Sequence, residues 1–68
     1  MRVAIRKTSQ QIVGYYEIDY SGNKTVRDIS GRILGYYDSS RDVTMTISRQ
    51  IIAYGDITGI FFKDQFNI

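Results

Sequence analysis

The chain contains no cysteine and no histidine. The absence of thiols and imidazoles excludes disulfides and the common cysteine- or histidine-based metal sites. It also removes the usual nucleophile and the usual general base, so any catalysis would depend on carboxylates. We therefore predict a protein that is not an enzyme and that carries no cofactor.

Long apolar runs are absent as well. In segment 1–7, charged side chains interrupt each short apolar stretch, so neither a signal-peptide core nor a membrane span can be drawn. We expect a soluble, cytoplasmic protein that makes no membrane contact.

Charge of one sign is also scarce, because nine Lys and Arg residues against seven Asp and Glu residues leave a net charge of +2. The basic residues are interleaved with acids and form no cluster along the chain. Since phosphate contacts dominate nucleic-acid affinity, we do not expect strong binding to nucleic acid.

The size of the chain limits its core, because only 43% of its 68 residues are hydrophobic. We predict one domain spanning 1–68. Apolar burial in so small a domain roughly cancels an ordering cost of about 1.5 kcal/mol per residue, so a further source of stability is expected. With disulfides and metal excluded, self-association into a symmetric homo-oligomer is the predicted source.

Three segments of the sequence resemble one another: 11–17 (QIVGYYE), 32–38 (RILGYYD) and 50–56 (QIIAYGD). Their equivalent isoleucines are 21 and then 18 residues apart, a spacing that suits two strands and two turns. Each repeat is therefore predicted to be one β-hairpin with its connection.

A second pattern, Asp-x-Ser/Thr-Gly, occurs at 19–22, 28–31 and 56–59. It is typical of a type I turn, in which Asp accepts bonds from the turn amides and Gly takes the positive φ of a following bulge. Degenerate copies without Gly occur at 7–10, 38–41 and 46–49.

These turns bound short segments rich in β-branched and aromatic residues, which is typical of an all-β fold. We predict an antiparallel meander of about seven strands built from repeated β-hairpins, ring- or barrel-like in shape. The expected strands are 2–7, 11–18, 23–28, 32–38, 42–46, 50–56 and 60–66.

A three-residue loop at 29–31 would pair Arg27 with Ile33 and Val26 with Leu34, and strict alternation then divides the side chains between two faces. The predicted core face contains Val3, Ile5, Val13, Tyr15, Val26, Leu34, Tyr36, Ile52, Tyr54 and Phe62. The opposite face is also apolar, so we predict that a second subunit covers it. The predicted interface residues are Ile12, Tyr16, Ile33, Tyr37, Met45, Ile51 and Phe61.

Gly14 and Gly35 precede the two tyrosine pairs. They could leave bare backbone for a ligand, but we expect aromatic rings to cover them. The tyrosine pairs could form a stacking platform for sugars or bases, and we favour core and interface packing.

The stretches 28–38 (DISGRILGYYD) and 51–56 (IIAYGD) resemble the small repetitive domains called four-fold β-flowers, which have no known function. The resemblance covers most of the chain and depends on turn and strand residues. It implies a repeat architecture and no known activity. The PRC-barrel domains share a similar rhythm of aspartate and glycine.

Two functional hypotheses remain open. The first is a non-enzymatic structural or interaction module that self-associates. The second is a small β-barrel that binds nucleic acid or another anionic polymer, with Arg6, Arg27, Tyr16 and Tyr37 as its contacts. Nothing in the sequence identifies a small-molecule ligand, and the carboxylate pairs Glu17–Asp19 and Asp38–Asp42 are interpreted as turn residues.

Overall fold

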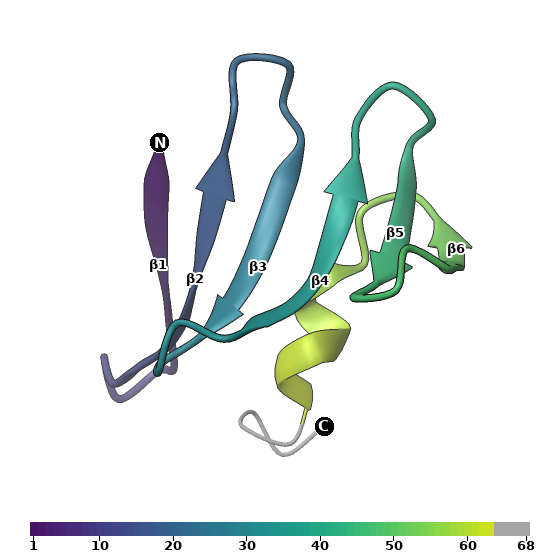
Figure 1. The fold of residues 1–68 in the computed structure, drawn as a ribbon. Helices are drawn as coiled ribbons and strands as arrows, with labels where there is room; N and C mark the ends of the chain where they lie inside the picture. The colour runs from purple at the N-terminus through teal and green to yellow at the C-terminus, as the bar shows by residue number, and fades with distance from the viewer. Residues whose placement is uncertain (64–68) are drawn as a thin grey trace.

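A computed structural model describes residues 1–63 of the chain. It contains one six-stranded antiparallel sheet in which every strand pairs with the next along the chain (Figure 1). The strands are β1 (Arg2–Arg6), β2 (Ile12–Ile18), β3 (Lys24–Asp28), β4 (Ile33–Asp38), β5 (Val43–Thr46) and β6 (Ile51–Tyr54). The all-β meander of hairpins is thus confirmed, and the first six predicted strands lie where the sequence placed them.

Two finer predictions are wrong. The sheet is not closed into a barrel, because β1 and β6 form its two ends and do not pair. The seventh strand, expected at 60–66, is replaced by a 3₁₀-helix, η1 (Thr58–Phe62), and residues 64–66 lie outside the described residues.

The turns explain why the hairpins form. In the turn after β2, the Asp19 carboxylate accepts bonds from the Ser21 and Asn23 amides, and Gly22 has φ +87°. The turn after β3 repeats this arrangement around Asp28 and Gly31. These observations confirm the predicted geometry of both turns.

Two of the degenerate copies reach the same backbone conformation without glycine. Gln10 has φ +73° and Arg49 has φ +68°, and each amide bonds back to the first residue of its turn. The copy at 56–59 behaves differently, because Gly59 has no positive φ and Asp56 accepts the Thr58 amide where η1 begins. The prediction of a hairpin turn at 56–59 is therefore wrong.

Each repeat also contains a β-bulge that the sequence analysis missed. Register shifts leave Val13, Leu34 and Ile52 as the extra residues, and all three occupy the same position in the repeat. Arg27 pairs with Ile33 as predicted, but Val26 pairs with Gly35. Beyond the bulge, the predicted faces are therefore off by one residue.

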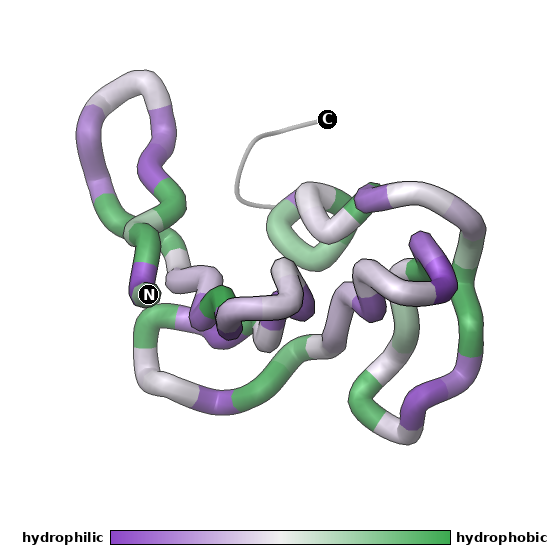
Figure 2. The backbone as a smooth tube through the Cα atoms, turned by 90° about the horizontal axis from the view of Figure 1, so that it is seen from above, coloured by the Kyte–Doolittle hydropathy of each residue, from purple (hydrophilic) through white to green (hydrophobic). Residues whose placement is uncertain are grey.

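The core lies between the sheet and η1, which covers one side of it (Figure 2). Its buried members are Val13, Val26 and Phe62, as predicted, with Ile5, Tyr16, Leu34 and Phe61 packed against them. Other predicted core residues are exposed, and the clearest is Tyr54, with 80% of its surface accessible. The reason is its position on β6, where no described strand lies beyond it.

Gly14 and Gly35 show why η1 fits so closely. A Cβ atom on Gly14 would lie 2.5 Å from Phe62 Cε1, and one on Gly35 would lie closer than 3.0 Å to the Phe61 ring. Two consecutive phenylalanines thus fill the equivalent glycine positions of two repeats. The prediction that aromatic rings cover these glycines is confirmed, and the cover comes from the chain itself.

Candidate functional site: the open face of the sheet

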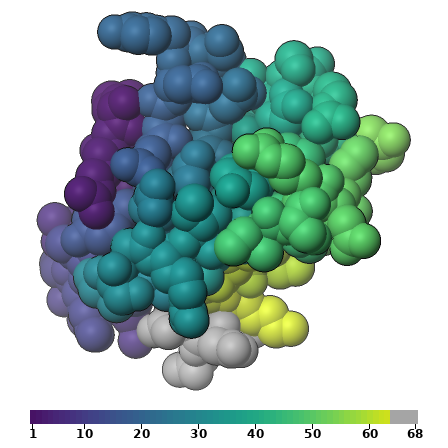
Figure 3. All heavy atoms as spheres, in the orientation of Figure 1, coloured from purple at the N-terminus to yellow at the C-terminus, as the bar shows by residue number. Residues whose placement is uncertain are grey.

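The side of the sheet opposite η1 is called the open face here. In the space-filling view of Figure 3, which looks onto this side, η1 is largely hidden behind β4 and β5. One row of directly paired residues crosses all six strands on this face. From β1 to β6 the row is Arg2, Glu17, Thr25, Tyr36, Met45 and Ile51.

Two arginine–tyrosine stacks stand on the open face. The Arg2 guanidinium carbon lies 4.0 Å from the centroid of the Tyr15 ring. The Arg49 guanidinium carbon lies 4.3 Å from the centroid of the Tyr36 ring. Such cation–π contacts keep a flexible arginine flat against the sheet. Each stack therefore presents a planar cation to solvent.

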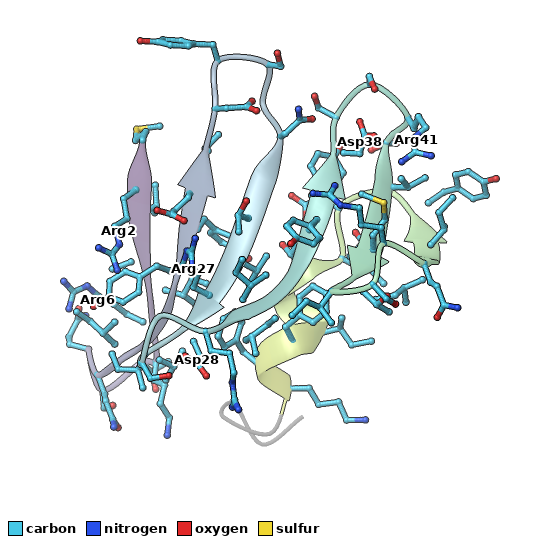
Figure 4. The ribbon with its side chains drawn as sticks, viewed as in Figure 1. Arg2, Arg6, Arg27, Asp28, Asp38 and Arg41 are labelled. Carbon is cyan, nitrogen blue, oxygen red and sulfur yellow. The ribbon has the colours of Figure 1, made fainter. Side chains whose placement is uncertain are left out.

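Arg27 stands between these stacks, in direct register with Tyr15. Its Nε donates to a Glu17 carboxylate oxygen, and its Nη1 donates to the Gly31 carbonyl at 2.8 Å. The hydrogen bond from Arg27 lowers the pKa of Glu17 below its ordinary value, so Glu17 stays ionised. Figure 4 shows Arg2 and Arg6 on β1 and Arg27 on β3, with β2 between these two strands.

A groove follows the cross-strand row. It consists of two adjoining cavities of about 310 and 220 Å³, and Asp19, Asn23 and Thr25 line both of them. Arg2 and Glu17 line its β1 end, while Tyr36, Met45 and Arg49 line its β5 end. Across four strand spacings of about 4.8 Å the groove extends about 19 Å.

The acids beside the groove have structural partners. Asp38 accepts from the Ser40 hydroxyl at 2.7 Å and from Arg41 Nε at 2.9 Å. These two bonds lower the pKa of Asp38 to about 2. Asp19 accepts two backbone amides of its own turn. The Asp38 and Asp19 carboxylates therefore stabilise their turns.

The opposite face contains a polar network that attaches η1 to the sheet. The buried Thr58 hydroxyl contacts the Tyr16 hydroxyl at 3.0 Å and donates to Asp56 at 2.7 Å. Asp56 also accepts from Lys24 Nζ at 2.5 Å. Burial acts to raise the pKa of Asp56, but the bonds from Lys24 and Thr58 outweigh it and lower that pKa. This face is structural.

The structure does not bring the seven predicted interface residues together. Tyr16 and Tyr37 lie on the η1 side, where Lys24 Nζ lies 5.0 Å and 5.8 Å from their ring centroids. Phe61 packs over Gly35. Met45 is buried on the open face, Ile12 and Ile33 are half-buried, and Ile51 is exposed. The bulges place Tyr16 and Tyr37 on the side opposite Ile12 and Ile33, and Phe61 lies in η1 instead of a seventh strand.

The residues proposed for nucleic-acid contact are also divided between the two faces. Arg6 and Arg27 belong to the open face, whereas Tyr16 and Tyr37 belong to the η1 face. The tyrosines that accompany the arginines are Tyr15 and Tyr36. The glycine after Leu34 was a possible sign of the bulge that puts Tyr36 on the open face and Tyr37 on the η1 face. A glycine within a strand does not by itself identify a bulge, so the sequence analysis missed it.

Neither a metal site nor a membrane-spanning helix is found within residues 1–63. No three carboxylates of that segment form a group that could hold a metal ion. No helix there is long and apolar enough to cross a membrane. Comparison of the chain with protein-family models, with curated proteins and with solved structures finds no match.

Proposed function

We propose that the protein is a non-enzymatic interaction module that self-associates by pairing the outer edge of β6 with a second copy. The observation that carries this proposal is the character of the edge. The strand Ile51–Tyr54 has no charged residue, and its side chains include the exposed Ile51, Ile52 and Tyr54. Within residues 1–63, no strand pairs with β6 on its outer side.

Such an edge presents unpaired backbone donors and acceptors beside apolar side chains, which favours pairing with another strand. The other end of the sheet is different, because β1 begins with Arg2 and ends with Arg6. Edge charges of this kind oppose pairing with another strand. Self-association is therefore assigned to β6 rather than to a whole face of the sheet.

The absence of catalytic machinery in the described residues supports the non-enzymatic part of the proposal. Asp19, Asp28 and Asp38 accept turn amides, Asp56 opens η1, and Glu17 pairs with Arg27. The remaining described acid, Asp42, accepts the Tyr37 hydroxyl at 2.5 Å. Each of these carboxylates already has a structural role.

The mass of the protein in solution tests the proposal. Light scattering behind size exclusion at micromolar concentration should give a mass above the 7.8 kDa of one chain. Tyr54→Lys places a charge on the β6 edge and should return the mass to that of one chain. Tyr20→Lys is the matched control, because Tyr20 is an exposed tyrosine in the β2–β3 turn, away from β6.

Two outcomes would contradict the proposal. One is a wild-type mass of one chain at every concentration tested. The other is an assembled Tyr54→Lys variant with unchanged β-structure by circular dichroism, which would move the interface to another surface.

A further inference from the structure

The fold gathers positive charge on the open face, although the sequence disperses it. The four arginines of this face are Arg2, Arg6, Arg27 and Arg49, from two strands and one turn. Glu17 and Asp19 are the acids that line the groove beside them, while Asp38 pairs with Arg41. Four arginines against these two acids leave a charge of +2 on this one face, equal to the net charge of the whole chain.

The arginines at the ends of the groove are available to a ligand. The ion pairs formed within residues 1–63 engage Lys24, Arg27, Arg32 and Arg41. Arg2 and Arg49 belong to none of these pairs, and each lies on a tyrosine ring at one end of the groove. Arg6 donates to the Gln10 carbonyl and keeps its positive charge.

We infer that the open face is a binding site for single-stranded nucleic acid, which would lie along the cross-strand groove. Arginine supplies planar, doubly donating contacts to phosphate. Unpaired bases stack on aromatic rings and on guanidinium planes, which the Arg2–Tyr15 and Arg49–Tyr36 stacks provide. Charge complementarity and stacking thus favour the same ligand.

A duplex fits this surface less well. Its bases are stacked and paired, so the two guanidinium planes would have nothing to stack against. Duplex recognition also depends on a helix or ribbon that enters a groove, and the open face bears neither of these above the described sheet. Single strands are therefore expected to bind better than a duplex of the same sequence.

The predicted affinity is modest, because only three of the open-face arginines, Arg2, Arg6 and Arg49, have no carboxylate partner among the described residues. Three phosphate contacts give a slope of log K against log salt of about −2 for a single strand. Binding should therefore be weak at about 0.15 M salt and clearly measurable at a tenth of that concentration. This agrees with the weak attraction expected from the net charge.

Fluorescence anisotropy with a labelled oligothymidylate of about 12 nucleotides tests the inference. The double variant Arg2→Gln/Arg49→Gln should lose at least about tenfold in affinity at low salt, and its slope should fall to about −0.7. Each single variant, Arg2→Gln or Arg49→Gln, is also compared with Arg32→Gln, a control that removes the same one charge from an arginine that is exposed in the β3–β4 turn and pairs with Asp28. Arg32→Gln should keep the wild-type slope. Circular dichroism confirms that all variants are folded.

Three outcomes would overturn the inference. They are no binding at low salt, equal losses in the double variant and in Arg32→Gln, and equal or tighter binding of the duplex. A fourth, competition by polyglutamate at the same charge concentration, would assign the face to acidic proteins instead. Repeating the comparison of the arginine variants in the Tyr54→Lys background separates this test from self-association, because the added lysine is then common to all the proteins compared.

Discussion

The two faces of the sheet are built from the same repeats, yet they have opposite characters. On the η1 face, Gly14 and Gly35 let two phenylalanine rings approach the backbone. On the open face, arginines lie over Tyr15 and Tyr36. The repeat supplies one tyrosine to each side, and the single copy of η1 decides which side becomes the core. A non-repeated segment thus breaks the equivalence of two similar surfaces.

The largest expected effect comes from removing the ring that fills one glycine site. Phe62 is 2% exposed and packs with Val13 and Val26, so Phe62→Ala should destabilise the protein by about 3–5 kcal/mol. Urea unfolding followed by circular dichroism measures this loss. The control is Ile60→Ala in the same helix, where Ile60 is about half exposed, and its effect should be about 0.5 kcal/mol. Equal losses would show that η1 does not pack as described.

A smaller effect is expected from filling the glycine site from the other side. Gly35→Ala would place a methyl group against both the Phe61 ring and the Met45 carbonyl, and the carbonyl belongs to the sheet. Overpacking of this kind costs about 1–3 kcal/mol. Gly59→Ala is the matched control, since nothing lies within 4 Å of its Cβ position and its φ is not positive. Similar unfolding midpoints for these two variants would contradict the close approach of Phe61.

The smallest expected effect comes from the ionisation of the Tyr37 hydroxyl on the η1 face. The hydrogen bond to Asp42, assisted by burial, raises the pKa of Tyr37 from 10.0 to about 12. The protonated form is favoured in the folded state, so this contribution to stability is complete below pH 10 and is lost as the pH rises toward 12. The ultraviolet absorbance of tyrosinate reports the titration.

Subtracting the titration curve of Tyr37→Phe from that of the wild type should isolate one ionisation near pH 12. Asp42→Asn removes the charged acceptor, so the same ionisation should then occur at lower pH. A difference curve centred at the ordinary tyrosine pKa in the wild type would mean that the Tyr37–Asp42 bond is not formed in solution.

The strands could be predicted because their boundaries depend on local chemistry. The Asp19 and Asp28 carboxylates accept hydrogen bonds from amides of their own turns, and a four-residue sequence pattern is enough to predict such local bonds. The faces could not be predicted, because one extra residue at Leu34 reverses every side chain beyond it. Apart from the following glycine, nothing local distinguishes a bulged leucine from a paired one.

The predictions for the C-terminal segment and for the open face failed for different reasons. Asp56-Ile57-Thr58-Gly59 matches the turn pattern, but tertiary contacts of Thr58 with Tyr16 and of Phe62 with the core favour a helical turn. The cluster of arginines on the open face could not be predicted, because positions 2, 6, 27 and 49 are spread along the sequence. Only the register of the strands brings them to one surface. The resemblance to four-fold β-flowers stays a prediction.

The two edge strands of the sheet differ in charge, and this difference limits how far the protein can assemble. If both edges accepted a strand, β6 of one copy could join β1 of the next, and addition would continue without limit into a fibre. Arg2 and Arg6 oppose that step at β1, whereas two β6 strands can meet about a two-fold axis. In such a dimer both β6 edges are paired, and the two outer edges are β1 strands that carry arginines. The first association event is then also the terminating one, so protein concentration sets the fraction assembled but not the length of the product.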